Sequence, residues 1–313
     1  MRWRSPHSPF LLLFISLLTV FVGRVTGFKI CSYNVGKLTP KKAANQRVIY
    51  TITQVVSQCD ICLLQNVIDP ESKATKNLVH ALSRRNDRYG KSSYATVSSG
   101  GLGNSTNDMQ QYVFLYRKNT VNMTGHHQYE SKGFFLRDPF VVKFQSNKTA
   151  IKDFILVPLH SNPNNVVKEL NKLYDVYVEV TNKWKNTNVM FLGDFHADCG
   201  YLSRSDKKNI RLYTNRMFTW LVKDRVDTTV NSQMSCAYDR IVVSGKPFLK
   251  AIKPLSAQPF KLDSKIPKAM VLEVSNHMPV EVTLKSSAGL LQAASLLILL
   301  SVSAIVQSFL SAL

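Results

Sequence analysis

Short apolar runs recur along the chain between residues 28 and 285, and most are continuous rather than alternating. Continuous runs of this length are typical of strands that are covered on both faces. They predict strands at Phe28–Val35, Ile61–Val67, Tyr112–Tyr116, Phe140–Phe144, Phe154–Leu159, Val189–Leu192, Ile241–Val243 and Val280–Leu284.

Two longer segments between these runs have a helical period instead. The apolar residues of Asn45–Gln58 fall on one helical face, and those of Val166–Trp184 recur at alternating steps of four and three. These spacings are typical of helices with one buried face. Strands that alternate with helices imply sheets packed between helical layers. The pattern therefore predicts a single α/β domain.

The first 27 residues have the pattern of a signal peptide. Arg2 and Arg4 precede an uncharged apolar run, and small residues at positions 25 and 27 favour cleavage before Phe28. An uncleaved anchor helix is the alternative. The apolar run holds 14 residues, whereas a spanning helix needs about 20. We therefore predict cleavage, and with it entry into the secretory pathway.

Residues 286–313 form a second hydrophobic segment. Lys285 is the last charged residue, four small residues follow it, and the chain is mainly apolar from Leu290 to Leu313. A membrane helix would usually be followed by Lys or Arg on its cytoplasmic side. The tail instead predicts a GPI-attachment signal, although the polar spacer of such signals is almost absent. We expect a signal peptide (1–27), a domain (28–285) and this tail (286–313) in a protein on the extracellular face of the membrane or secreted, with the endoplasmic reticulum as an alternative location.

The predicted mature domain is strongly basic. Without the three arginines of the signal peptide it keeps 37 basic against 20 acidic residues, a net charge of +17. Such an excess favours polyanionic partners, such as nucleic acid, glycosaminoglycan or an acidic membrane face. Three Asn-x-Ser/Thr sequences, at Asn104, Asn122 and Asn147, predict glycosylation on accessible surfaces.

Five cysteines are present, and in an oxidising compartment an odd number leaves at least one thiol unpaired. Cys31 and Cys62 lie within predicted strands, where a free cysteine commonly acts as a small buried apolar residue. The sequence alone leaves the pairing open.

Four segments place a polar residue at the end of an apolar run. They are residues 157–160, 193–199, 237–240 and 275–279, which contain His160, Asp194 with His196, Asp239 and His277 respectively. Strand ends on a rigid sheet are where catalytic groups converge. Each residue alone has a simpler explanation, such as a turn-capping Asp or a local ion pair between Asp239 and its neighbour. Together they predict acid–base and metal-assisted hydrolysis of a phosphodiester.

These segments resemble the deoxyribonuclease I family, and within it the subgroup with a C-terminal hydrophobic tail. The similarity spans most of the chain from Phe28 to Lys285. Further matching stretches are Ser32-Tyr33-Asn34-Val35, Leu64-Gln65-Asn66-Val67, Phe114-Leu115-Tyr116-Arg117, Arg137-Asp138-Pro139, Leu173-Tyr174-Asp175-Val176-Tyr177 and Pro279-Val280-Glu281-Val282.

The resemblance implies a four-layer α/β/β/α sandwich, two mixed sheets flanked by helices, and endonucleolytic cleavage of DNA with Mg²⁺, usually helped by Ca²⁺. It implies that His160 and His277 are the acid and base, that Asp239 orients His277, and that Asp194 lies beside phosphate and metal. It further implies that Asn34 contacts phosphate or metal, and that Arg137 and His196 contact phosphate. A disulfide between Cys199 and Cys236 and three free thiols would follow. Asp227-Thr228-Thr229 resembles the start of a structural calcium loop, with a turn-capping Asp227 as the alternative and Thr229 as a second candidate ligand.

Several positions depart from the family pattern. Asn66 stands where the family has a metal-binding Glu, Asn276 where it has an Asp, and Gln110 where a Glu partners the first His. His196 replaces an Asn. The positions that insert Arg and Tyr into the DNA minor groove hold Ile68 and Asp108.

These departures predict an eroded site. Mg²⁺ is usually held through carboxylates, and Asn66 and Asn276 offer neutral oxygens. Gln110 cannot stabilise an imidazolium as a carboxylate does, so the pKa of His160 should fall. The cluster of His160, His196, His277 and Asp194 would suit Zn²⁺ or Mn²⁺ better, unless His196 merely replaces an amide as a hydrogen-bond donor.

We therefore expect a DNA- or polyanion-binding protein with weak or lost endonuclease activity. An active endonuclease with altered metal dependence, and a glycosylated adhesion or heparin-binding protein, are the alternatives. The chain is predicted to be a monomer, joined to the membrane by its lipid anchor.

Overall fold

The computed structural model describes residues 27–87, 93–105, 109–230, 233, 235–262 and 266–287. Nearly all of the predicted signal peptide and hydrophobic tail lies outside these ranges, so both remain predictions. In the described part of the chain, no helix is long and apolar enough to cross a membrane.

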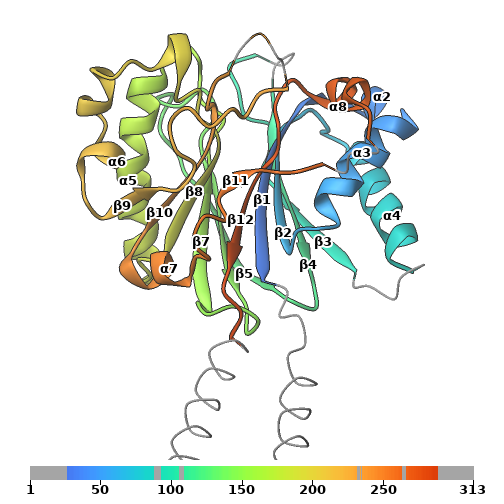
Figure 1. The fold of residues 1–313 in the computed structure, drawn as a ribbon, viewed down its shortest axis with the longest axis horizontal. Helices are drawn as coiled ribbons and strands as arrows, with labels where there is room; N and C mark the ends of the chain where they lie inside the picture. Colours follow the sequence, from blue (N-terminus) through green and yellow to red (C-terminus); the bar gives the residue numbers. More distant parts are fainter. Residues whose placement is uncertain are drawn as a thin grey trace, which may run out of the picture.

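The strands form two mixed six-stranded sheets (Figure 1). The first has the order β11-β12-β1-β2-β4-β3 and the second the order β5-β6-β7-β8-β10-β9. In the first, β1 pairs parallel with β2 and antiparallel with β12. Its strands are β1 (Phe28–Leu38), β2 (Ile61–Val67), β3 (Tyr94–Ser98), β4 (Gln111–Arg117), β11 (Gln258–Pro259) and β12 (Val280–Leu284). The second contains β5 (Asn122–Gln128), β6 (Phe140–Gln145), β7 (Asp153–Pro158), β8 (Val189–Asp194), β9 (Phe218–Trp220) and β10 (Asp239–Ser244).

Helices cover the outer faces of both sheets (Figure 1). Those on the first sheet are α2 (Pro40–Ala43), α3 (Gln46–Val56), α4 (Lys73–Asp87) and α8 (Lys268–Val274), and those on the second are α5 (Val166–Trp184) and α6 (Arg211–Thr214). The helix α7 (Lys246–Ala251) follows β10, and the short 3-10 turns η2 (Cys199–Tyr201) and η3 (Asp206–Asn209) precede α6.

Alternation along the central strands divides most of the core into three large apolar clusters, and a fourth, small cluster lies around Val230, Ile266 and Val271. On β1, Ile30 packs between the two sheets, whereas Cys31 packs beneath the helices of the first sheet. On β7, Leu156 faces the other sheet and Val157 faces α5. Continuous apolar runs are therefore needed because both faces of each central strand are buried. The four-layer sandwich is confirmed.

Two disulfides are present, where only one was implied. The bond between Cys199 and Cys236 is confirmed. Cys31 also pairs with Cys59, with Cα atoms 6.1 Å apart, and Cys62 is the one free and buried cysteine. The implied set of three free thiols was therefore wrong. Cys31 points to the helical face of β1, and the turn after α3 places Cys59 over it, within bridging range.

The two ends of the described domain lie side by side. Phe28, at the start of β1, pairs with Leu284, at the end of β12. His160, Asp194 and His277 lie at the opposite ends of their strands. In Figure 1 the start of β1 and the end of β12 lie at the bottom, while α8 lies at the top.

Candidate active site

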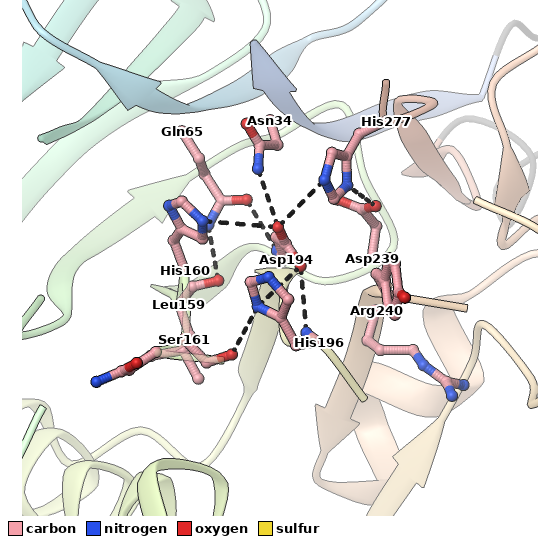
Figure 2. A network of polar contacts seen from close by, with 12 residues as sticks. Asn34, Gln65, Leu159, His160, Ser161, Asp194, His196, Asp239, Arg240 and His277 are labelled. Carbon is pink, nitrogen blue, oxygen red and sulfur yellow. Dashed lines mark hydrogen bonds and ion pairs between the residues drawn. The ribbon is translucent and has the colours of Figure 1, made fainter. Parts of the chain in front are cut away.

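The predicted site residues converge on one end of the sandwich. Asp194 is the last residue of β8, His160 lies just beyond β7, and Asp239 begins β10. From the other sheet, β1 contributes Asn34 and the segment before β12 contributes His277. Both sheets thus present polar groups to one point (Figure 2).

Asp194 is at the centre of this group and is fully buried. Asn34 Nδ2 donates to its Oδ2 at 2.9 Å. The Nε2 atoms of His160 and His277 lie 3.6 Å and 3.5 Å from the same oxygen. Burial favours the neutral acid, but the charges of the surrounding histidines and the Asn34 hydrogen bond hold the pKa of Asp194 below its ordinary value.

A buried glutamine fixes Asp194 in place, and sequence reasoning gave it no role. Gln65 is fully buried on β2, accepts from Asp194 N at 2.9 Å and donates to Leu159 O at 2.7 Å. It therefore joins the two sheets beneath the site. Gly193 has φ +137°, and a Cβ there would lie 2.2 Å from Leu159 O and 2.4 Å from Gln65 Nε2. Only glycine permits this close approach.

His277 has the carboxylate partner that the sequence predicted. Its Nδ1 lies 2.8 Å from Asp239 Oδ2, and both residues are buried. Thr228 Oγ1 accepts from Asp239 N and so positions the start of β10. Burial alone would lower the pKa of His277, but the Asp239 and Asp194 carboxylates outweigh it and raise the pKa to about 9. This histidine is therefore an imidazolium at neutral pH.

His160 has an amide partner instead. Its Nδ1 lies 2.9 Å from Gln110 Oε1, and its backbone N donates to the Tyr112 hydroxyl at 2.9 Å. Burial is the main cause that lowers the pKa of His160 to about 3, despite the nearby Asp194 carboxylate. The direction is the one expected. Arg137 is buried beside it, with Nη1 3.5 Å from His160 O, and its phosphate contact remains a prediction.

His196 adds a third imidazole. Its Nδ1 lies 3.1 Å from Ser161 Oγ and 3.4 Å from Asp194 Oδ1, and its ring stacks on that of His160 at 5.8 Å. The backbone at His196 has φ +47°, a left-handed conformation that Asn adopts more readily than His. Ser161, like Gln65, was not predicted.

The amide positions determine which cation the site suits. Asn66 Nδ2 donates to Asn34 Oδ1 at 3.2 Å, and the buried Oδ1 of Asn66 has no hydrogen-bond partner among the described residues. Asn276 is exposed beside His277. The oxygens of Asn34, Asn66 and Asp194 are of the type that Mg²⁺ accepts, so the set fits this ion, but it carries a single carboxylate.

Two groups of three side chains could hold an ion in the described part of the chain. One consists of His160, Asp194 and His196, and the other of Asp194, Asp239 and His277.

Other predicted positions lie outside this centre. Asp227 Oδ1 accepts from the N and Oγ1 of Thr229 at 2.9 Å and 2.7 Å, as expected of a turn-capping Asp. Calcium binding there stays a prediction. Arg240 is fully buried and pairs with Asp224 at 2.9 Å rather than with its neighbour Asp239. Ile68 is half-buried, and Asp108 lies outside the described residues.

The three predicted glycosylation sites are all exposed. Asn122 and Asn147 flank one hollow of about 240 Å³ at the end where the chain leaves the domain. Asn104 lies in the loop before Gln110, at the site end. Exposure meets a requirement for modification, which itself remains a prediction.

Comparison with known proteins agrees with this geometry. Residues 31–275 match the Endonuclease/Exonuclease/phosphatase family. The chain is 38% identical to human deoxyribonuclease gamma over 287 residues, which cover 90% of this chain and 92% of that protein. It is 36% identical to human deoxyribonuclease-1-like 1, over 95% of this chain and 96% of that protein. The chain belongs to the deoxyribonuclease I family.

The fold is shared more widely than the sequence. A protein of the endonuclease/exonuclease/phosphatase family from Leptotrichia buccalis superposes with a TM-score of 0.59 at 15% identity, covering 82% of this chain and 99% of that one. At this identity the likeness concerns the fold alone. The family is typically dependent on a divalent cation, and the histidine–carboxylate groups of this deoxyribonuclease I-family chain are candidate ligands.

Proposed function

We propose that this chain is a secreted or surface-anchored protein that binds DNA and other polyanions and hydrolyses phosphodiesters weakly. The observation that carries the proposal is the partner of His160. An amide oxygen, from Gln110, faces its Nδ1 where a carboxylate would stabilise the protonated ring. The positive charge of the predicted mature domain, +17, supports retained binding of polyanions.

One protonated and one neutral histidine could still act as the acid and the base in hydrolysis. His277, held as an imidazolium by Asp239, is placed to donate a proton to a leaving oxygen. Neutral His160 is placed to accept one from water, which reverses the roles that the resemblance implied. With its pKa lowered to about 3 and an amide behind its Nδ1, the ring would be a weak base. A bound divalent cation would supply positive charge for the phosphate, and Asn34, Asn66 and Asp194 would hold it. Because only one of these three is a carboxylate, we infer that Mg²⁺ is held weakly.

An active endonuclease with altered metal dependence is the second candidate. The intact pair of His277 and Asp239 favours it, as does the additional nitrogen ligand at His196. This candidate requires the same two histidines but a different ion.

Plasmid nicking and gel shift on the same preparation separate the candidates. The chain is incubated at low salt with Mg²⁺ and Ca²⁺, with Mn²⁺, with Zn²⁺ or with chelator, and His160→Ala/His277→Ala serves as the contaminant control. We expect DNA to shift on the gel in every condition, with nicking close to the control. Nicking well above the control with any one metal would favour the second candidate. Failure to shift DNA at low salt would refute the binding proposal.

The surface location is tested separately. Removal of N-glycans should reduce the apparent mass, and a phosphatidylinositol-specific phospholipase C should release the protein from cells if the tail is replaced by a GPI anchor. Retention after phospholipase treatment would favour a membrane helix. A heparin column that fails to retain the chain at physiological salt would exclude heparin binding as the adhesive alternative.

A further inference from the structure

We propose that His160, Asp194 and His196 together bind a first-row transition ion, zinc in particular. The inference rests on the proposed function, in which the site has few carboxylates. In such a site the histidine nitrogens determine which metal ion binds. Zinc is bound by His nitrogens and carboxylate oxygens, whereas Mg²⁺ prefers oxygen.

The spacing of the three side chains suits such an ion. Asp194 Oδ1 lies 3.4 Å from His196 Nδ1, and Asp194 Oδ2 lies 3.6 Å from His160 Nε2. Ligands about 2.0–2.1 Å from a tetrahedral zinc lie about 3.3 Å from one another. The ligand atoms of the three residues all lie within 4.8 Å. An ion can therefore be accommodated with small adjustments.

The hydrogen bonds around His160 present the correct nitrogen. Gln110 Oε1 can only accept, so Nδ1 of His160 is the donor. The other ring nitrogen, Nε2, faces Asp194 (Figure 2). Zinc-binding histidines generally donate their second ring nitrogen in this way, which fixes the ring. An amide acceptor leaves the ring neutral, and its Nε2 then offers one lone pair, either to a cation or to a proton. A zinc ion bound there would therefore remove His160 as the base.

The second possible group is less suitable. In the group of Asp194, Asp239 and His277, the Nδ1 of His277 is already engaged with Asp239 at 2.8 Å. In the first group His196 Nδ1 also has a partner, Ser161 Oγ at 3.1 Å, but this is a neutral hydroxyl that can rotate to another partner, and the ring nitrogens lie 3.4 Å and 3.6 Å from Asp194. The first group also contains His196, the residue that replaces the family's Asn.

Zinc titration of the full chain, freed of metal with chelator, tests this assignment. Calorimetry should give one equivalent of zinc, and Co²⁺ added instead should give the visible absorption of a low-coordinate site. His196→Asn should weaken binding by at least about 100-fold, because loss of even an outer partner costs 10–100-fold. Asn tolerates the left-handed backbone at this position, so the variant should fold.

Two further variants locate the ion. His80→Asn, at an exposed position on α4, should bind like the wild type. Asp239→Asn should change the zinc affinity only a few-fold. Wild-type affinity in His196→Asn, or loss of binding in Asp239→Asn alone, would overturn the assignment. DNA binding by His196→Asn in chelator is measured in parallel, so that failure of the zinc site is not confused with failure of the proposed function.

A second observation, independent of the first, concerns the end from which the chain leaves the domain. We infer that the segment from α7 to Leu255 is a contact surface for an anionic lipid bilayer. Leu255 is 98% exposed and Leu249 is 40% exposed. Exposed lysines surround them, namely Lys246, Lys250, Lys253 and Lys285. Residues 245–256 contain no acidic residue.

This surface, which we call the α7 patch, adjoins the start of the hydrophobic tail. Lys285 Nζ donates to Lys250 O at 2.7 Å, and Lys253 N donates to Thr283 O at 2.8 Å. In the proposed arrangement, with the tail either exchanged for a lipid anchor or kept as a membrane helix, the membrane would begin a few residues beyond Lys285. Exposed leucines among lysines are the combination that binds at an anionic headgroup surface. The site, at the opposite end, would then face away from the membrane.

Lipid-quenching fluorescence on the full chain in vesicles tests the α7 patch. A fluorophore is placed on Leu255→Cys, and the control is Leu272→Cys, on α8 at the opposite end and 48% exposed. We expect spin-labelled lipid to quench the label at 255 in phosphatidylserine vesicles and to leave the label at 272 bright. Replacing Lys246, Lys250 and Lys253 by Glu should reduce the docked population by about 100-fold.

Equal quenching at both positions, or quenching at 255 that the three Glu substitutions leave unchanged, would refute the surface. All of these variants keep the hydrophobic tail, so any attachment through the tail is the same in each measurement. The inference rests on the proposed membrane anchoring. DNA binding is not measured here, so the outcome is independent of the proposed binding and hydrolysis of DNA.

Discussion

The two histidines that flank Asp194 are nearly equivalent in position but opposite in chemistry. Each directs Nε2 to the same carboxylate oxygen, at 3.6 Å for His160 and 3.5 Å for His277. They differ in what lies behind the ring, Gln110 for the first and Asp239 for the second. The pKa of His160 is lowered to about 3, and that of His277 is raised to about 9.

If hydrolysis is weak, as we propose, this comparison explains how an active site can lose activity while keeping its shape. An amide and a carboxylic acid differ by few atoms, and both accept a hydrogen bond from Nδ1. Only the carboxylate offsets the cost of burying a charged imidazole. The fold therefore keeps both histidines in similar positions, but only His277 has a carboxylate that stabilises its protonated ring.

The largest effect on stability is expected from Asp239→Asn. Removing one partner of a buried ion pair leaves a charge uncompensated and costs about 3–5 kcal/mol. The pKa of His277 should fall at the same time. Urea unfolding and NMR of the imidazole measure the two effects, with Gln110→Ala as the matched variant, which should cost about 1–3 kcal/mol. Equal losses of unfolding free energy in the two variants would mean that the partners of His277 and His160 do not differ in strength as described.

Gln110→Glu should give His160 the same kind of partner that His277 has. A carboxylate behind Nδ1 should raise the pKa of His160 by about 1–3 pH units. Imidazole shifts in NMR titrations provide the measurement, and His277 serves as the internal reference because its partner is unchanged. A His160 pKa that stays near 3 would show that burial alone controls it.

The pH dependence of stability should reveal the same contrast. The pKa of His277 is raised in the folded state, so its contribution is present below about pH 6.5 and is lost as the pH rises through about 9. The pKa of His160 is lowered, so stability should fall as the pH drops from about 6.5 toward 3, where only the unfolded chain takes up that proton. Asp239→Asn should remove the alkaline loss, and a wild-type alkaline limb in that variant would contradict the account.

The smallest expected effect is that of His80→Asn. This exposed histidine of α4 lies outside the site, and surface substitutions of this kind usually change the free energy of unfolding by about 0.5 kcal/mol or less. A larger loss of stability, or an altered pKa at His160 or His277, would show that residues outside the site also control these properties.

The parts of the fold that the sequence predicted share a physical feature. Central strands such as β2 and β8 are buried along all or nearly all of their length, and their apolar runs predicted their ends correctly or within two residues. Edge strands did not give this signal. On β3 and β5 buried or half-buried positions alternate with exposed ones, and β5 begins with the exposed Asn122. The helix α4 was missed because it is polar over much of its length.

The site shows the same division. Residues at strand ends, such as Asp194 and His160, were predicted because an abrupt change from apolar to polar is visible in one dimension. Gln65 and the Cys31–Cys59 disulfide depend on which strands and helices become neighbours, and that is a property of the tertiary structure. The lowered pKa of His160 was predicted only through the family resemblance, because nothing in the sequence around Gln110 indicates that it lies beside His160.

The central claim is that exchange of acids for amides has weakened hydrolysis on an intact frame. The direct test is plasmid nicking in Mg²⁺ and Ca²⁺ by the wild type and by Asn66→Glu/Gln110→Glu/Asn276→Asp, with His160→Ala/His277→Ala as the contaminant control. The account predicts wild-type nicking close to the control and a gain of about 10²-fold or more in the restored variant. Wild-type nicking far above the control, with no gain on restoring the acids, would contradict it.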